Sequence, residues 1–262
     1  MPPYAPDALT RTQPRESQGE LTPQAFVHHR PDLIRAALDG IPSDAVSHFA
    51  SSWNALPADA YVEAERPYRF RRYGKFHLSE DGLRQVSHGP FLQAKAVNKL
   101  SGGVPRHFAP LDEAVATGLA LRAIVGALHD QLPGPHQDIN ACGIHQIRVT
   151  AVPGAEGDPA PEGMHQDGHR YVGQVLIRRD GVHGAQSRIY DLDRRLVYQS
   201  QLTAPWESIV LDDRRVLHDA SPVGVALGAD LAVRDMLLVD FFADPALPDP
   251  SPRPLSKGQS HD

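Results

Sequence analysis

The sequence predicts a mainly β protein with flanking helices, of the sandwich, barrel or jelly-roll type. After residue 140 the chain consists largely of short stretches rich in β-branched and aromatic residues, separated by turn residues. Strands at this spacing are typical of such folds and not of alternating βα units. Before residue 140, two regions carry apolar residues at helical spacing, so helices are expected to flank the sheets.

The two ends of the chain differ in composition from the part between them. Residues 1–20 and 245–262 are polar and rich in proline, and such segments bury too little apolar surface to offset the entropy of ordering them. Both are predicted to be disordered tails. A single domain is expected over residues 21–244, with a helix-rich N-terminal region in 21–56 and the β core mostly in 140–244.

Individual elements of this domain follow from local patterns. The stretch TPQAFVHHRPDLIRAALDGI predicts a helix with Thr22 as its cap, and the alternation in RPYRFRRYGKFHLS predicts a strand. The clearest helix is expected over residues 111–132, with Asp112 and Glu113 in its first turn. The other strands are predicted at 143–152, 170–179, 187–192, 196–202, 207–213 and 235–243.

Charge and composition narrow the classes of function. The formal net charge is -6 and no block of Lys or Arg dominates, so neither nucleic acid nor an anionic membrane is an expected partner. Cys142 is the single cysteine, which excludes an intrachain disulfide and a tetrahedral thiolate zinc site. Without a signal peptide or a long apolar run, we expect a cytoplasmic protein that acts on a small molecule. The oligomeric state stays open.

The stretch PEGMHQDGH, residues 161–169, carries a candidate metal site. On an extended backbone the side chains of His165 and Asp167 point to the same side, and His218 in the stretch VLDDRRVLHDASPV could supply a third ligand. Two imidazoles and one carboxylate suit a non-heme Fe(II) oxygenase with open positions. A His-x-Asp pair can also occur by chance in a chain with 14 histidines.

Arg234 opens the last predicted strand, RDMLLVDFF. A guanidinium at this place could hold the distal end of a dicarboxylate through two parallel hydrogen bonds. The alternative is an ordinary arginine at the edge of a sheet.

Several segments together resemble the bacterial 2-oxoglutarate/Fe(II) dioxygenases that hydroxylate free aliphatic L-amino acids, the isoleucine-hydroxylase type. The resemblance covers roughly residues 60–243 and is most specific in the PEGxHxDG string. It is carried by VNKLSGGVPRHFAPL, GIHQIRV, TAVPGAEGDPAPEGMHQDGHRYV, HDASPV and RDMLLVDFF.

This resemblance implies a double-stranded β-helix, the jelly roll also found in cupins, with iron at one open end. By matching positions, His165, Asp167 and His218 would bind Fe(II), and Arg234 would bind the C5 carboxylate of 2-oxoglutarate. Fe(II), 2-oxoglutarate and O2 are then the expected cofactor and co-substrates. The implied reaction hydroxylates a free L-amino acid at an unactivated C–H, with release of succinate and CO2.

A zwitterionic amino-acid substrate needs a cationic side chain to bind its carboxylate and an acceptor to bind its ammonium group. Arg106, Asn98 and Arg148 lie in segments that resemble the family's, although each could instead make a salt bridge or a turn contact. Alternation sends Arg69 and Arg71 to one face of their strand and Phe70 and Arg72 to the other. Part of this basic run is expected to be a solvated strand face, and one of its members could reach a substrate carboxylate. His145, between apolar neighbours, is interpreted as a structural histidine.

Two other classes of function remain compatible with these patterns. A non-catalytic jelly-roll protein would use its cavity to bind a ligand and would need no divalent metal. A cupin-like metalloenzyme would need a metal but would not depend on 2-oxoglutarate. Arg234 favours the dioxygenase over both.

Overall fold

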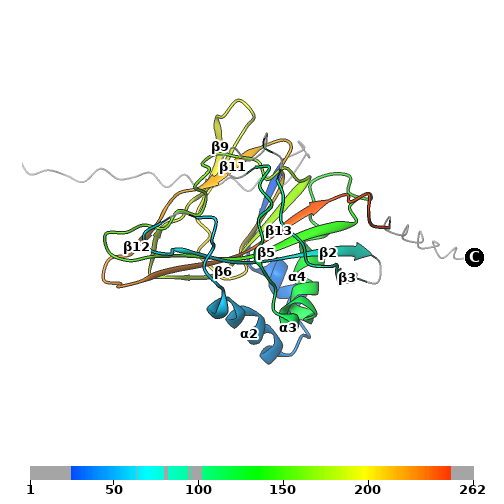
Figure 1. Cartoon of the computed structure of the whole chain (residues 1–262), viewed down its shortest axis with the longest axis horizontal. Coiled ribbons are helices and arrows are strands. Elements are labelled where there is room, and N and C mark those ends of the chain that lie inside the picture. Colours follow the sequence, from blue (N-terminus) through cyan, green and yellow to red (C-terminus); the bar gives the residue numbers. More distant parts are fainter. Residues whose placement is uncertain (1–24, 63, 80–81, 94, 96–101, 249–262) are drawn as a thin grey trace, which may run out of the picture.

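The computed structural model describes residues 25–62, 64–79, 82–93, 95 and 102–248. Helices cover one face of a large sheet, and smaller sheets face its other side (Figure 1), which confirms the predicted fold class. The helices are α1 (Asp32–Leu38), α2 (Ser43–Ser51), the 3-10 helix η1 (Ser52–Ala55), α3 (Glu113–Ala116) and α4 (Leu119–His129).

The strands of the described chain form one large sheet and two small ones. In the large sheet the order is β1-β10-β6-β13-β5-β2-β3, with β4 beside β2, and the small sheets are β11-β8-β9 and β12-β7. The bounds are β1 (Phe26–His29), β2 (Arg69–Ser79), β3 (Gly82–Gln85), β4 (Ala109–Pro110), β5 (Ala141–Ala151), β6 (Tyr171–Asp180), β7 (Val182–Gly184), β8 (Ser187–Tyr190), β9 (Leu196–Ser200), β10 (Ser208–Asp212), β11 (Leu217–Ala220), β12 (Val223–Val225) and β13 (Ala232–Phe242).

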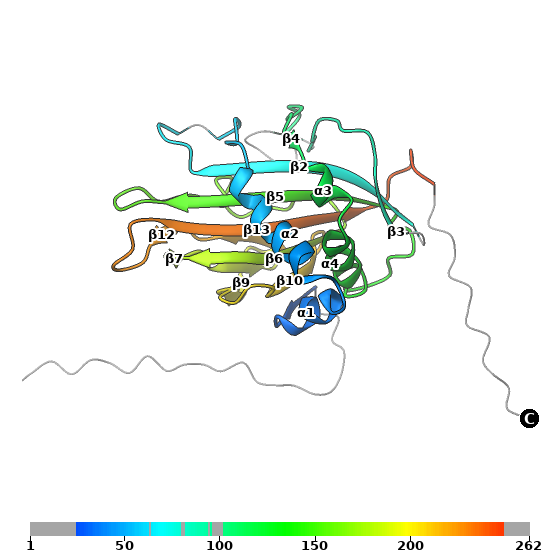
Figure 2. The same ribbon diagram turned by 90° about the horizontal axis from the view of Figure 1, so that it is seen from below.

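The helices pack on the large sheet through an apolar stripe. In α4 the residues Leu121, Ile124, Val125 and Leu128 are buried at helical spacing, and Figure 2 shows α2 and α4 lying across the strands. Since side chains alternate along a strand, every second residue of the central strands faces these helices. Among them are Phe76, Ile144, Val175, Leu237, Val239 and Phe241.

The opposite face of the large sheet is partly covered by the small sheets. Ile189 of β8 packs with Val172, Ile209 and Met236 of the large sheet in a second apolar cluster. The two layers form a flattened barrel in which the inner side chains of β2, β5 and β13 border a cavity. None of the helices in the described ranges is both long and apolar enough to span a bilayer.

The segment predicted as a helix from Thr22 onward begins differently. Phe26–His29 form strand β1, which pairs with β10 in the register Val27↔Val210, and the helix starts only at Asp32, after Pro31. Proline disfavours the α conformation of the residue before it, so a continuous helix through Arg30 is unfavourable. Thr22 lies outside the described residues.

The helix predicted over residues 111–132 is divided into α3 and α4. Asp112, expected in the first turn, lies just before it and caps α3 by accepting a hydrogen bond from the backbone N–H of Ala114. Gly118 is extended and precedes α4; a Cβ there would lie 2.7 Å from the carbonyl oxygen of Ala114. Glycine therefore permits the sharp change of direction between the two helices.

The expected tails lie largely outside the described residues, at 1–24 and 249–262. The described residues 245–248 lie against the domain, because Asn140 donates its side-chain N–H to the carbonyl oxygens of Leu247 and Pro248. Asn140 also accepts a hydrogen bond from the backbone N–H of Asp244 at 2.7 Å.

Trp53 is expected to be a major source of stability. Its side chain is fully buried between helix and sheet, and its indole N–H lies 3.2 Å from the carbonyl oxygens of both Ile147 and Met236. Trp53→Ala should lower the free energy of unfolding by about 3–5 kcal/mol, measured by urea titration with circular dichroism. Leu227→Ala, at a fully exposed position, should change it by less than about 0.5 kcal/mol. Equal losses in both variants would contradict this account of the core.

Candidate metal and substrate site

The cavity between the two layers is lined by alternate residues of three neighbouring strands. Because β2, β5 and β13 are adjacent in the large sheet, side chains of one parity share the face opposite the helices. The residues that reach the cavity from these strands are Arg69 and Arg71 of β2, His145, Ile147 and Val149 of β5, and Arg234, Met236, Leu238 and Asp240 of β13.

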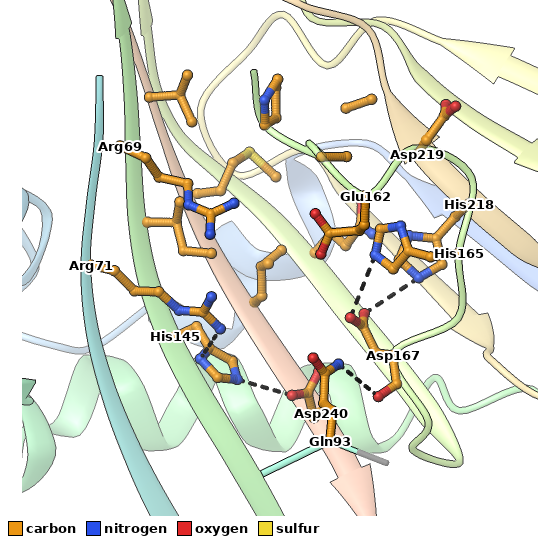
Figure 3. A pocket seen from close by; sticks show the side chains of 18 of the residues that line it. Arg69, Arg71, Gln93, His145, Glu162, His165, Asp167, His218, Asp219 and Asp240 are labelled. Carbon is orange, nitrogen blue, oxygen red and sulfur yellow. Dashed lines mark hydrogen bonds and ion pairs between the residues drawn. The ribbon is translucent and has the colours of Figure 1, made fainter. Parts of the chain in front are cut away.

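His165, Asp167 and His218 meet at one wall of this cavity (Figure 3). One ligand atom from each lies within 4.8 Å of the others. The backbones of His165 and His218 form an antiparallel bridge, with N–H···O distances of 3.0 and 2.9 Å in the two directions. This pairing brings the two imidazole rings to a centroid distance of 4.6 Å.

The loop around Asp167 is held by neighbouring polar groups. His165 Nδ1 lies 2.7 Å from the carbonyl oxygen of Gly163; since a carbonyl only accepts, Nδ1 is the donor and Nε2 faces Asp167. The buried carboxylate of Asp213 accepts the backbone N–H groups of Asp167 and Gly168 at 2.9 and 2.8 Å. Gly168 has a φ of +83°, which favours glycine at this turn.

The carboxylate of Asp167 and the imidazoles of His165 and His218 stabilise one another's charged forms. Burial alone would lower the pKa of His218, but the carboxylates of Asp167 and Asp213 raise it to about 10. Burial alone would raise the pKa of Asp167, but His165 and His218 hold it well below its usual range. The raised pKa of His218 means that proton release is expected when a divalent cation binds here.

Arg234 presents an unpaired positive charge to the same cavity. Its side chain is 5 % exposed, and its Nε has no hydrogen-bond partner within the described part of the chain. Burial and the nearby Arg179 lower the pKa of Arg234 to about 10. A buried guanidinium without a carboxylate is costly, so this position fits the free carboxylate of a bound dicarboxylic acid.

The three predicted substrate-binding residues differ in their position relative to the cavity. Arg106 lines the cavity, is 3 % exposed and donates a hydrogen bond to Gln93 Oε1. Asn98 lies outside the described residues. The structure does not bring Arg148 to the cavity: it lies on the helix-facing side of β5 and forms a two-pronged ion pair with Asp235 at 2.6 and 2.8 Å.

The strand face of Arg69 and Arg71 is buried and lines the cavity, so it is not the solvated part of this basic run. These side chains are 7 % and 8 % exposed and point into the cavity (Figure 3). Arg69 pairs with Asp59 at 2.8 Å, and Arg71 donates to His145 Nδ1 at 2.7 Å. The i, i+2 spacing of the arginines is the signal that identifies their common face, but it does not tell what covers that face.

His145 is buried and hydrogen-bonded, and it also lines the cavity. Its Nε2 lies 2.9 Å from Asp240 Oδ2. Burial is the largest cause that lowers the pKa of His145 to about 4, and Arg71 lowers it further, so the imidazole is neutral at physiological pH. Gln93, Glu162 and Asp240 are further cavity residues that sequence patterns did not single out.

A double-stranded β-helix with two histidines and one carboxylate gathered at an open cavity defines the class of jelly-roll non-heme metalloenzymes. A model of the 2OG-Fe dioxygenase family matches residues 50–240. The chain belongs to this family. It is therefore a non-heme iron, 2-oxoglutarate-dependent dioxygenase, and its family uses Fe(II), 2-oxoglutarate and O2. The two alternative functions left open by the sequence are not favoured.

Similar solved structures support the fold. A homolog of bsmA from Methylobium petroleophilum PM1 is 29% identical, with a TM-score of 0.73 over 84% of this chain and 89% of that one. IDO from Bacillus thuringiensis is 18% identical, with a TM-score of 0.69 over 84% and 94%. The Fe(II)/(alpha)ketoglutarate-dependent dioxygenase TqaL is 16% identical, with a TM-score of 0.64 over 84% and 83%. No curated protein matches the chain.

Proposed function

We propose that this dioxygenase hydroxylates a free L-amino acid at an unactivated C–H. His165, Asp167 and His218 hold Fe(II), and Arg234 binds the C5 carboxylate of 2-oxoglutarate. Arg106 contributes positive charge for the carboxylate of the amino acid. The resemblance of PEGMHQDGH and the flanking segments to amino-acid hydroxylases supports this assignment, and so does the charge pattern of the cavity.

The residues of the chain bind and orient the reactants. When bound, Fe(II) with 2-oxoglutarate and O2 supplies the oxidation that turns C–H into C–OH and 2-oxoglutarate into succinate and CO2. Arg234 fixes one end of the co-substrate, because its guanidinium can donate two parallel hydrogen bonds to a carboxylate. Ile147, Met236 and Leu238 line the same cavity and limit the access of water to the reacting centre.

The charge balance of the cavity favours a substrate without net charge. Fe(II) and doubly ionised 2-oxoglutarate cancel each other, as do Asp167 and Arg234. The other unpaired cavity cations, Arg71 and Arg106, are matched by the acidic side chains of Asp240 and Glu162. A zwitterionic amino acid preserves this balance, since its carboxylate can meet an arginine and its ammonium can meet Glu162.

A substrate screen tests the proposed function. The protein, loaded anaerobically with Fe(II) and then exposed to air with 2-oxoglutarate, is incubated with each common L-amino acid. One or more uncharged aliphatic amino acids should gain one oxygen by mass spectrometry, with an equal amount of succinate. Acidic and basic amino acids should react much more slowly.

Controls without 2-oxoglutarate or without amino acid should give neither product. Product structures must be assigned by NMR, because oxidation of methionine sulfur gives the same gain in mass. If every amino acid leaves succinate formation at the background rate and no oxidised product forms, the amino-acid assignment is refuted, while membership of the dioxygenase family stands.

A further inference from the structure

We infer that Arg71 and Arg106 form a clamp of two guanidinium groups for the substrate's carboxylate, and that His145 and Asp240 are positioning residues for this clamp. The inference rests on the proposed function and deepens it, because it names the group of the substrate that is recognised. The clamp is separate from Arg234, which serves the co-substrate.

Both guanidiniums are buried and form no direct ion pair with the described residues, although Asp240 and Glu162 balance their charges within the cavity as a whole. Arg71 and Arg106 are 8 % and 3 % exposed, and both line the cavity. Within the described ranges neither forms an ion pair with a carboxylate, and the Nε atom of each is buried without a hydrogen-bond partner. Arg69 differs, because Asp59 neutralises it at 2.8 Å. Two buried like charges of this kind are stabilised when a bound anion lies between them.

Aromatic rings hold the two guanidiniums in place. The Cζ atom of Arg71 lies 4.3 Å from the ring centroid of Phe108, and that of Arg106 lies 4.9 Å from the ring centroid of Phe91. Each guanidinium also lies within 5.7 Å of the other ring. Such cation–π contacts keep a guanidinium charged and rigid, and they leave its N–H edges available to an anion.

A hydrogen-bonded chain orients the guanidinium of Arg71 (Figure 3). Asp240 can only accept when ionised, so His145 Nε2 donates to it at 2.9 Å. This leaves His145 Nδ1 as an acceptor for Arg71 Nη2 at 2.7 Å. The order of donors and acceptors therefore fixes both the tautomer of His145 and the direction of Arg71.

Gln93 connects the other half of the clamp to the candidate iron site. Its Oε1 accepts a hydrogen bond from Arg106, and its Nε2 donates to the backbone carbonyl oxygen of Asp167 at 2.9 Å. The substrate's carboxylate would thus be held at a fixed distance from Asp167. This spacing determines which carbon of the substrate lies at the reacting centre.

Carboxamide analogues test the clamp without any mutation. For the amino acid identified by the screen, wild-type holoenzyme should use the free acid with a kcat/KM about 100-fold or more above that of its carboxamide, because two charge-assisted hydrogen bonds are lost. If acid and carboxamide react equally well, the clamp is refuted even though the amino-acid hydroxylase proposal stands.

Variants then assign the effect to individual residues. Arg71→Met and Arg106→Met should each raise KM for the amino acid by about 10- to 100-fold and reduce the discrimination against the carboxamide. KM for 2-oxoglutarate should stay within about twofold. Arg178→Met removes an exposed arginine and serves as the matched control, with all parameters unchanged. Unchanged KM for the amino acid in both clamp variants refutes the inference.

Asp240→Asn tests the positioning role. An amide can donate to His145 Nε2, which moves the imidazole proton to Nδ1 and removes the acceptor for Arg71. KM for the amino acid should rise about 10-fold, with kcat and the circular dichroism spectrum little changed. A fall in kcat at constant KM would contradict the role in substrate binding.

If the screen finds no amino-acid substrate, direct binding still tests the clamp. Titration calorimetry of the same amino acids and carboxamides uses the Fe(II)–2-oxoglutarate protein under nitrogen. The clamp is supported if the wild-type protein binds the acids and both Arg71→Met and Arg106→Met lose this binding. The absence of binding, or binding that both variants preserve, overturns it.

Discussion

Replacing Asp167 with alanine should lower the rate of substrate-dependent succinate formation by at least about 1000-fold. The change removes the negatively charged member of the proposed iron site and leaves two imidazoles, and a bound metal contributes several kcal/mol of transition-state stabilisation. Iron content, measured by plasma emission spectrometry after gel filtration, should fall in parallel. Asp230→Ala removes an exposed carboxylate and should retain both iron and activity.

Circular dichroism must show that Asp167→Ala is folded, because its backbone N–H and that of Gly168 still bind Asp213. His165→Ala should give the same loss. If both folded variants keep wild-type iron content and turnover, the metal lies elsewhere and the proposed site is refuted.

Replacing Arg234 with methionine should raise KM for 2-oxoglutarate by about 100-fold or more. On the proposed assignment, the variant loses the charged hydrogen bonds to the C5 carboxylate and leaves this buried carboxylate without its guanidinium partner. Arg234→Lys should be intermediate, because an ammonium keeps the charge but not the paired geometry. Initial rates of succinate formation at varied 2-oxoglutarate give these constants.

A shorter 2-oxo acid without the distal carboxylate provides the matched comparison. Wild type and Arg234→Met should use 2-oxobutanoate equally poorly. This acid has no C5 carboxylate, so neither protein can form the proposed ion pair with it. Should Arg234→Met retain the wild-type KM for 2-oxoglutarate, the C5 carboxylate binds another group, and the charge balance drawn for the cavity fails with it.

The candidate metal residues could be found from the sequence because their signal is local. His165 and Asp167 are separated by one residue in an extended stretch, and this spacing alone directs both side chains to one side. The partner His218 could be suggested from its place in a β-rich region. Its backbone pairing with His165 depends on long-range topology, which no local pattern contains.

The residues around the proposed substrate were harder to predict. The strand pattern correctly groups Arg69 with Arg71, yet whether that face meets solvent or a cavity depends on what packs over it. Phe91 and Phe108, which contact Arg71, come from a different part of the chain. Arg148 shows the converse case, because its role is set by Asp235 on the neighbouring strand.

The β1 segment shows the same limit for secondary structure. The spacing of apolar residues from Ala25 to Ile34 is compatible with a helix, but β10 offers an unpaired sheet edge to Phe26–His29. Pairing with an existing sheet outweighs weak local helix propensity. Pro31 marks the change from strand to helix, and it is the one local signal that could have divided the segment.

The main-chain bridge between His165 and His218 has a consequence for how the enzyme can be handled. Amide hydrogen bonds and the Asp213 carboxylate hold the proposed ligand residues in place within the protein itself. We therefore expect the chain to stay folded when the metal is removed. Chelators should therefore remove the metal reversibly without unfolding the protein. Redox-silent ions such as Ni(II) or Zn(II) should then bind at the proposed metal site. The resulting inactive complexes would hold 2-oxoglutarate and the amino-acid substrate together in air without turnover.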